Sequence, residues 1–458
     1  MNSMQLTDLI YQAGIIGCGG AGFPTHAKYS GEIETIIING AECEPLLQTD
    51  RYLMRNKAKE LIKAADMLLK ETGADVCVIA LKAAYTREAA AIEKAIEAEG
   101  SSVRIHEMAS FFPAGDEQTI VYEVTGRVVP PAGIPLNVGC VVSNVATLYC
   151  IYNAMKGEPF TKKYMTITGE VNNPVIAEVP VGTPVSECIK LAGGTNLYDY
   201  IVVNGGPMMG KVMTKEEAEN AFVTKTMSGL IILPLDSAIA RNSKISLVHM
   251  MNRAKSSCIQ CSFCSQLCPR ALLGHPIQPH RIMRKMASCK SIEDILEDKD
   301  ILNAALCCEC GICEIYACPM GLQPRKVNSM VKKELAKEGI RYQRPDKEWE
   351  ALPERSFRKA PTARVASRAG VAEYEDLQID ELKKLNSRSV KTVRLALHQN
   401  IGAPSVPVVQ NGAYVDRGQI IAACPEGKLG AVLHASISGT VTVEEQYIEI
   451  QSGKGESV

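Results

Sequence analysis

Hydrophobic and polar positions in the first third of the chain predict strands that alternate with helices. Two apolar runs, residues 34–40 and residues 76–81, have the length and the β-branched content of buried strands. Helical stretches are expected at about residues 51–72 and 87–98. Strands that alternate with helices indicate a mostly parallel sheet covered on both faces. We therefore expect an α/β domain over residues 1–160.

The pattern changes after this domain and divides the rest of the chain into four segments. Short strand runs, one short helix and glycine turns predict a small β-grasp module over residues 161–242. Residues 243–340 are helical around two groups of cysteines. Residues 341–388 are rich in Pro, Arg and Glu, so they are predicted to be a linker. Residues 389–458 return to short strands with glycine turns.

Composition and charge narrow the classes of protein. The chain has 458 residues, of which 46% are hydrophobic, and this apolar content excludes global disorder. Its 50 basic and 51 acidic side chains give a net charge of −1, which argues against a nucleic-acid-binding protein with a large cationic surface. No apolar stretch approaches the ~20 residues that span a bilayer, and the N-terminus lacks the pattern of a secretory signal. We expect a cytoplasmic protein.

Eight of the 17 cysteines fall in two short runs that each end in Cys-Pro. The first run is C-x2-C-x2-C-x3-C and the second is C-x2-C-x2-C-x4-C. An iron–sulfur cubane needs thiolates from several directions, and two-residue gaps let one tight loop supply three of them. Four-thiolate zinc sites are the alternative, but they usually combine two separate cysteine pairs, whereas here a triplet occurs twice. The runs therefore favour two [4Fe–4S] clusters.

In two-cluster ferredoxins the fourth cysteine of each run binds the other cluster. That rule predicts one ligand set of Cys258, Cys261, Cys264 and Cys318, and a second set of Cys307, Cys310, Cys313 and Cys268. The other nine cysteines, including Cys18 and Cys308, are interpreted as small buried hydrophobic residues. Basic residues around the runs, Arg270 among them, indicate either a positive surface near the clusters or an ordinary solvated helix face.

Polar loops in the first domain predict a nucleotide site. A loop over residues 17–28 contains four glycines, and such a loop can bring backbone N–H groups against a phosphate or a flat ring. Three more polar loops, residues 39–45, 113–117 and 143–147, follow strand-like runs. Open α/β sheets bind their ligands at the carboxyl ends of the strands.

These loops resemble those of the flavin- and NADH-binding subunit of respiratory complex I, and more closely those of the RnfC family. The order of the modules is similar to that of the PduS-type cobalamin reductase branch of this family. The resemblance implies a multidomain α/β protein with a Rossmann-like FMN/NADH domain and a β-grasp SLBB domain. A helical ferredoxin-like domain with two [4Fe–4S] clusters and a C-terminal barrel-sandwich hybrid domain would follow them.

The resemblance also implies which residues contact FMN and NADH. The expected contacts with the flavin are Gly17, Gly19, Gly20 and Gly22, with Asn144 and Thr147 near its phosphate. Those expected for the isoalloxazine, the ribose or the nicotinamide side are Asn39, Glu42, Glu44, Gly115, Asp116 and Glu117. Lys28 is expected near a phosphate or the nicotinamide nucleotide, and Phe23 either stacks on adenine or simply packs. Hydride transfer needs no acid–base side chain, so no catalytic residue is predicted.

Together these parts predict an NADH-dependent oxidoreductase. NADH delivers two electrons as a hydride while a cluster accepts one, and FMN can act between them. We expect electrons to pass from NADH to FMN, to two [4Fe–4S] clusters and to an acceptor. The resemblance implies a corrinoid acceptor, with a bacterial microcompartment as one location. The alternatives are a subunit that feeds a partner reductase, such as a methylenetetrahydrofolate reductase, in a larger protein complex, and a flavin-less electron relay suggested by Ser143, Ala146 and Ala84.

Overall fold

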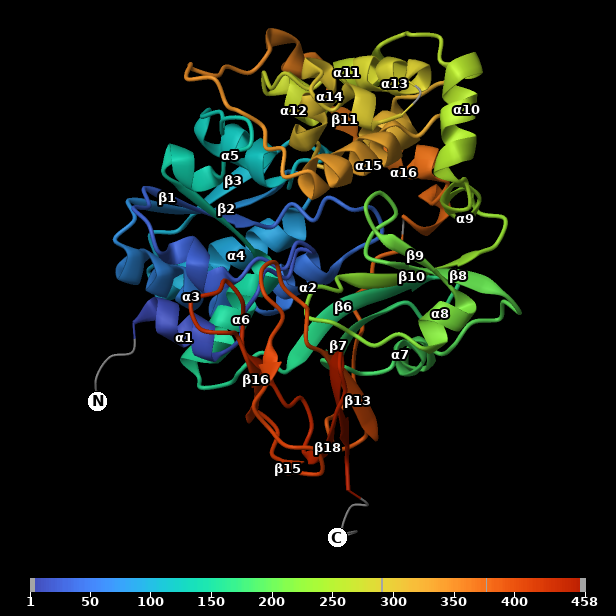
Figure 1. The fold of residues 1–458 in the computed structure, drawn as a ribbon. Helices are drawn as coiled ribbons and strands as arrows, with labels where there is room; N and C mark the ends of the chain where they lie inside the picture. The colour runs from blue at the N-terminus through green and yellow to red at the C-terminus, as the bar shows by residue number, and fades with distance from the viewer. Residues whose placement is uncertain (1–4, 290, 376, 454–458) are drawn as a thin grey trace.

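Four units follow one another along the chain in the computed structural model, which describes residues 5–289, 291–375 and 377–453. Figure 1 shows a first α/β unit on the left, with the helices around the cysteines above it. A six-stranded sheet lies on the right, and the C-terminal strands lie below. The multidomain α/β class expected from the sequence is confirmed.

The first unit contains a parallel sheet of four strands in the order β3-β2-β1-β5. The strands are β1 (Thr35–Asn39), β2 (Val76–Lys82), β3 (Arg104–Met108) and β5 (Cys140–Asn144). The main helices are α1 (Leu6–Gln12), α2 (Thr49–Asn56), α3 (Ala58–Thr72), α4 (Thr86–Glu99), α5 (Glu117–Thr125) and α6 (Val145–Met155). Ile36 and Ile38 face the core formed with α3, α4 and α6, whereas Ile37 faces α5. Both faces of the sheet are therefore covered, as the apolar runs predict.

The second unit is a mixed sheet in the order β12-β7-β6-β10-β8-β9. Its strands are β6 (Lys162–Gly169), β7 (Val175–Pro180), β8 (Tyr200–Asn204), β9 (Lys211–Thr214), β10 (Gly229–Pro234) and β12 (Leu382–Lys384). Helices α7 (Val185–Leu191) and α8 (Lys215–Glu219) accompany the sheet. Met165, Val202 and Ile232 lie in a core that includes Cys188 of α7.

Short helices surround the two cysteine runs. They are α9 (Ala238–Ser243), α10 (Leu247–Ser257), α11 (Phe263–Gln266), α12 (Pro269–Leu272), α13 (Pro279–Ser288), α14 (Lys299–Leu302), α15 (Pro324–Lys337) and a single π-helical turn at Ile312–Tyr316. Met250, Ile282 and Val327 form the core between α10, α13 and α15. Proline begins α12, α13 and α15, where its missing N–H has no helical partner to lose.

The segment predicted to be a linker, residues 341–388, is instead built partly into other units. Strand β11 (Ala360–Pro361) pairs with β4 (Phe111–Phe112) of the first unit, and β12 extends the six-stranded sheet. Between them, α16 (Thr362–Ala369) buries Val365 in the core beside the second cysteine run. The polar composition hides these few apolar positions, so the sequence predicts a linker although the segment joins three units.

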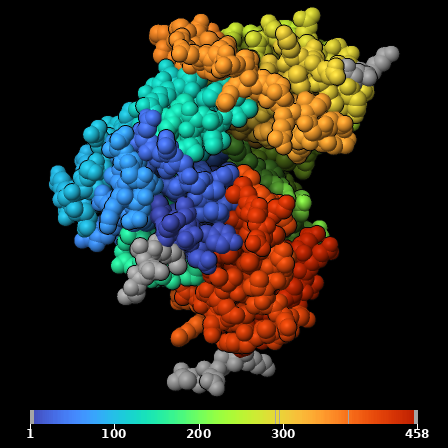
Figure 2. Space-filling view, turned by 60° about the vertical axis from the view of Figure 1, so that its left-hand side comes forward, coloured from blue at the N-terminus to red at the C-terminus, as the bar shows by residue number. Residues whose placement is uncertain are grey.

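The C-terminal unit consists of two small sheets that face each other. One contains β13 (Thr392–Ala396), β15 (Tyr414–Val415), β18 (Gly439–Val443) and β19 (Tyr447–Gln451), and the other contains β14 (Val406–Pro407), β16 (Ile420–Ala423) and β17 (Leu433–His434). Figure 2 shows this red unit against the blue N-terminal residues. The backbone N–H of Ile401 donates to the Gly22 carbonyl at 3.0 Å, so the unit touches the glycine loop directly. Within the described ranges, no helix has the length and apolar character to cross a membrane.

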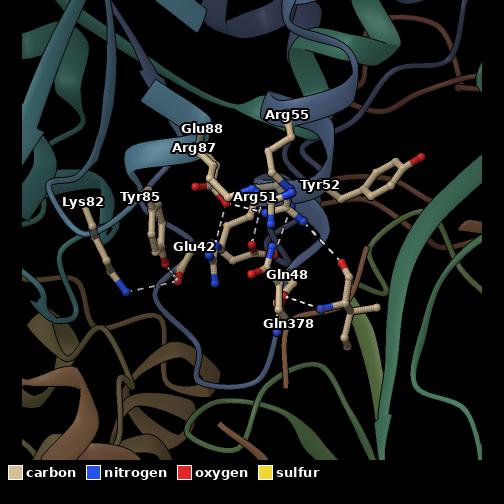
Figure 3. Close-up of polar contacts among 12 residues, drawn as sticks. Glu42, Gln48, Arg51, Tyr52, Arg55, Lys82, Tyr85, Arg87, Glu88 and Gln378 are labelled. Carbon is tan, nitrogen blue, oxygen red and sulfur yellow. Dashed lines mark hydrogen bonds and ion pairs between the residues drawn. The ribbon is translucent and has the colours of Figure 1, made fainter. Parts of the chain in front are cut away.

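A buried ion-pair network ties α4 to α2 and to the segment before β12 (Figure 3). The Glu88 side chain is 1% exposed, and its Oε1 accepts from Arg51 Nε at 2.9 Å and also from Arg55. Arg55 Nη2 lies 2.9 Å from Asp380 Oδ1. The network therefore joins two helices to a segment more than 300 residues away in sequence.

Glu88→Ala is expected to destabilise the chain by about 3 kcal/mol, because Arg51 and Arg55 lose the carboxylate that compensates their burial. The measurement is the thermal unfolding midpoint, followed by circular dichroism. The control is Glu187→Ala, which removes an exposed pair with Lys190 and should leave the midpoint unchanged. Equal midpoints for the two variants would contradict a stabilising role for the network.

Candidate functional site

The predicted polar loops meet at the carboxyl edge of the first sheet. Asn39 ends β1 and Asn144 ends β5, and the two residues pair in the parallel register. Asn39 Nδ2 donates to the Gly115 carbonyl at 2.7 Å, which brings the loop before α5 to the same place. Three segments that are far apart in sequence therefore form one edge, where such sheets bind their ligands.

Asn144 and Thr147 hold the start of α6 and the glycine loop together. Asn144 Oδ1 accepts from the Ala146 N–H at 2.8 Å, which caps α6, while its Nδ2 donates to Asp50 Oδ2 at 2.6 Å. Thr147 Oγ1 accepts the backbone N–H of Cys18 at 2.9 Å. The N-terminus of α6, with its partial positive charge, therefore lies beside the glycine loop.

The glycine loop presents an open backbone surface next to Asn144. Gly19, Gly20 and Ala21 are exposed, and Gly20 has a φ of +105°, which favours glycine. A Cβ added at Gly20 would meet nothing within 4 Å, and one added at Gly19 would lie 3.7 Å from Asn144 Cβ. This open surface, free of large side chains and close to a helix N-terminus, fits a flavin nucleotide.

Lys28 lies at the centre of a second group of predicted residues. Its ammonium donates to Glu117 Oε1 at 2.8 Å and to the Val142 carbonyl at 3.0 Å. The same Nζ lies 5.9 Å from the centroid of the Phe23 ring. The structure therefore brings together Phe23, Lys28 and Glu117, which the sequence separates by up to 94 positions.

Glu42 and Glu44, expected to face the flavin or NADH, both make contacts within the protein. The two Glu42 carboxylate oxygens accept the N–H groups of Asp50 and Arg51, each at 3.1 Å, at the first turn of α2. Glu44 Oε2 accepts the Met208 N–H at 2.8 Å, so this side chain points toward a turn of the six-stranded unit. Burial raises the pKa of Glu44 to about 7. Its Oε1 is buried and has no hydrogen-bond partner among the described residues.

Asp116 makes the contact that the sequence does not predict. Its carboxylate caps α5 by accepting the Thr119 N–H at 3.1 Å. It also forms two hydrogen bonds with the Arg270 guanidinium, at 2.5 and 2.9 Å, and both side chains are buried. Burial alone would raise the Asp116 pKa, but Arg270 outweighs it and the pKa is lowered. Arg270, one candidate for a positive surface, is thus a buried partner of the nucleotide site.

The thiols of the two cysteine runs are grouped across the runs. The Cys264 pKa is raised to about 12, first by burial and then by Cys318, Cys261 and Cys258 as neighbours. Burial also raises the pKa of Cys313, whose other neighbours include Cys307 and Cys268.

This grouping is the one that the crossed ligand sets require, and four thiolates on each side fit a [4Fe–4S] cluster. In the described part of the chain, no three His, Cys, Asp or Glu side chains are placed to hold a single metal ion. The assignment of individual ligands stays a prediction.

Comparison with known families matches four domain models along the chain. A model described as the Nuo51 FMN-binding domain matches residues 10–153, and an SLBB domain model matches residues 164–212. A 4Fe-4S dicluster domain matches residues 257–323, and the RnfC barrel sandwich hybrid domain matches residues 368–458. These matches confirm the four expected kinds of domain and, with them, the expectation of FMN and iron–sulfur clusters.

Curated relatives match over either the whole chain or its larger part. The cobalamin reductases PduS of Citrobacter freundii and Salmonella typhimurium are both 36% identical, over 99% of this chain and 97% or 98% of their own. An RnfC-type component of the Na(+)-translocating ferredoxin:NAD(+) oxidoreductase complex of Acetobacterium woodii is 33% identical, over 59% of this chain and 58% of its own. One solved chain, of an NAD+-reducing [NiFe]-hydrogenase, is 18% identical with a TM-score of 0.48, over 74% of this chain and 62% of its own.

The crossed ligand sets predict how pairs of cysteine substitutions combine. Cys261→Ala with Cys318→Ala removes two ligands of one cluster, so about four of eight irons should remain after anaerobic reconstitution. Cys261→Ala with Cys268→Ala removes one ligand from each cluster and should lose both. Iron analysis and electron paramagnetic resonance (EPR) measure the outcome, and Cys308→Ala, which lies off both sets, is the control. Loss of both clusters in the first pair and of one in the second would show that each run binds its own cluster.

Proposed function

We propose, because this chain belongs to the PduS cobalamin reductase family, that it carries electrons from NADH to a corrinoid. The chain is an iron–sulfur flavoprotein with oxidoreductase function, since its FMN-binding and dicluster domains match the family models. The observation that carries the proposal is the 36% identity to PduS cobalamin reductases over 99% of the chain. NADH as the donor fits this family, whereas the acceptor is the part that we propose.

We assign the flavin to the open surface of the glycine loop at Gly19 and Gly20. The capped N-terminus of α6, with Asn144 and Thr147, would hold its phosphate, since helix N-termini bind anions. Lys28 would supply a positive charge for a phosphate of either nucleotide, and it would exchange Glu117 for that partner. When bound, FMN supplies the conversion between a hydride and single electrons.

The cysteine set that contains Cys268 is proposed to receive electrons first. Cys310 lies in the hydrophobic core that also contains Phe112 and the partly buried Cys43 of the nucleotide site. Arg270, which binds Asp116, interacts with the thiols of Cys308 and Cys310. This set therefore adjoins the edge of the first sheet at which we place the flavin.

The set that contains Cys258 is proposed to be the terminal one, because it lies at the surface. Cys258, Cys261 and Cys264 are only partly buried. Ile259, Phe263 and Met320 flank this set, and their side chains are 61%, 48% and 37% exposed. An apolar surface of this kind beside the last cluster suits the docking of a corrin ring or of a partner protein.

A second candidate function is a subunit that passes electrons to a partner reductase in a larger complex. The observation in its favour is the 33% identity to an RnfC-type component of an ion-translocating oxidoreductase complex. The site geometry would be the same, and only the acceptor at the terminal cluster would differ. The two functions are therefore distinguished by what the isolated chain can reduce.

The test uses the full chain, reconstituted anaerobically with FMN and iron–sulfur clusters. With NADH it is expected to reduce cob(III)alamin, followed by the absorbance of the corrinoid. Cys261→Ala should lose most of this activity while NADH still bleaches the flavin, because only the terminal cluster is removed. Cys77→Ala, a buried thiol away from both runs, is the matched control.

Three results would count against these functions. Equal corrinoid reduction by Cys261→Ala and the control would exclude a path through the terminal cluster. An isolated chain that reduces an artificial dye with NADH but leaves cob(III)alamin untouched would favour the partner reductase. Absence of bound flavin after reconstitution would contradict both functions.

A further inference from the structure

Two thiols outside the cluster ligand sets lie in contact beneath the glycine loop. Cys18 Sγ lies 4.0 Å from Cys150 Sγ, although the residues are 132 positions apart. Cys18 is part of the glycine loop, and Cys150 lies on α6. The sequence alone suggests ordinary buried thiols at both positions, because nothing in the local pattern relates them.

The backbone around Cys18 is anchored, so the contact between the two sulfurs is defined. The Cys18 N–H donates to Thr147 Oγ1 at 2.9 Å, and its carbonyl accepts from Lys163 Nζ at 3.4 Å. Thr147 and Cys150 are three residues apart and therefore share one face of α6. The loop and the helix thus present their thiols to each other.

Two buried lysines place positive charge next to the thiol pair. Lys163 and Lys225 are each 2% exposed, and neither forms an ion pair with a carboxylate among the described residues. The Cys18 pKa is lowered to about 6, first by the hydrogen bond with Cys150 and then by Lys163, against the effect of burial. Asp50 is the opposing charge nearby, but burial raises its pKa well above the usual range. The Cys18 thiolate is the nucleophile that thiol–disulfide exchange needs.

A cavity gives small molecules a route to both sulfurs. It has a volume of about 250 Å³ and is lined by Cys18, Cys150, Lys163, Tyr149 and Phe160, among others. It lies between α6 and the strand β6 of the second unit. Although Cys18 is nearly inaccessible to bulk solvent, Cys150 is only partly buried. A compact disulfide reagent can therefore reach the pair without unfolding the chain.

We propose that Cys18 and Cys150 form a reversible disulfide that weakens the hold of the glycine loop on the flavin. The Cys18 thiolate attacks an external low-molecular-weight disulfide and releases one thiol. The Cys150 sulfur then attacks the mixed disulfide, the Cys18–Cys150 bond forms, and the second thiol leaves. The two cysteines lose two electrons, the external disulfide gains them, and the two thiol protons end on the released thiols.

The disulfide is expected to move the glycine loop, because the sulfurs must close from 4.0 Å to about 2.05 Å. Cys18 directly precedes Gly19, so the displacement reaches the surface at which we place FMN. We expect the Kd for FMN to rise about fivefold or more on oxidation. This effect on FMN rests on the proposed function, whereas disulfide formation does not.

The first experiment detects the disulfide itself. The reconstituted chain is treated anaerobically with 2-hydroxyethyl disulfide, free thiols are alkylated in acid, and tryptic peptides are analysed by mass spectrometry. The expected product joins residues 1–28, which contain Cys18, to residues 128–156, which contain Cys140 and Cys150, with fragmentation placing the bond at Cys150. It should disappear on reduction with dithiothreitol and in Cys150→Ser, and it should persist in Cys77→Ser. A bond at Cys140, or only separate mixed disulfides, would overturn the proposal.

The second experiment measures the Kd for FMN before oxidation, after oxidation and after reduction again. The rise is expected in the unaltered chain and in Cys77→Ser, and it should be absent in Cys150→Ser. A cross-linked chain with an unchanged Kd would overturn the coupling to the flavin loop. A chain that cross-links but binds no FMN in any form would contradict the proposed function and leave the thiol pair established.

Discussion

The buried ion pair between Asp116 and Arg270 fixes the cysteine-rich unit against the nucleotide site. Two charges removed from water are stable only as partners, and loss of one typically costs about 3–5 kcal/mol. Asp116 begins α5 at the carboxyl edge of the first sheet, and Arg270 follows Cys268 by two residues. The two hydrogen bonds between them therefore set the position of one cluster ligand relative to the proposed flavin surface.

A shared hydrophobic core supports this pair from the other units. Leu47 of the first unit, Met208 of the six-stranded unit and Ile312 of the second cysteine run lie in one buried group with Val365 of α16. Glu44 adds a polar link, since it accepts the Met208 N–H. The six-stranded unit and α16 thus act as spacers that hold the second cysteine run beside the first sheet. A route for electrons needs such fixed geometry, because the protein's contribution to cofactor chemistry is largely to position the groups.

Much of the fold was predictable because local periodicity determines it. β1, β2 and α4 lie within two residues of their expected ranges, since each has a clear apolar face. The helix expected at about residues 51–72 is two helices, α2 and α3, which are separated at Lys57. That break depends on packing against neighbouring elements, which the local pattern does not contain.

The site was predictable as a set of loops but not in its contacts. Gly20 and Asn144 reach one surface because parallel strands end at one edge, which topology predicts. Arg270 and the Cys18–Cys150 pair were missed because their partners are 154 and 132 residues away. Such contacts depend on how the units pack, and no spacing rule identifies them in a single sequence.

The order of the two clusters is the most direct test of this electron path. Rapid-freeze EPR after mixing the reconstituted chain with NADH would follow each cluster, with the signal that Cys261→Ala lacks assigned to the terminal one. We expect the signal of the Cys268 set to appear first and that of the Cys258 set to appear later. Reduction of the Cys258 set first, or at an unchanged rate in Cys268→Ala that lacks the other cluster, would contradict this path.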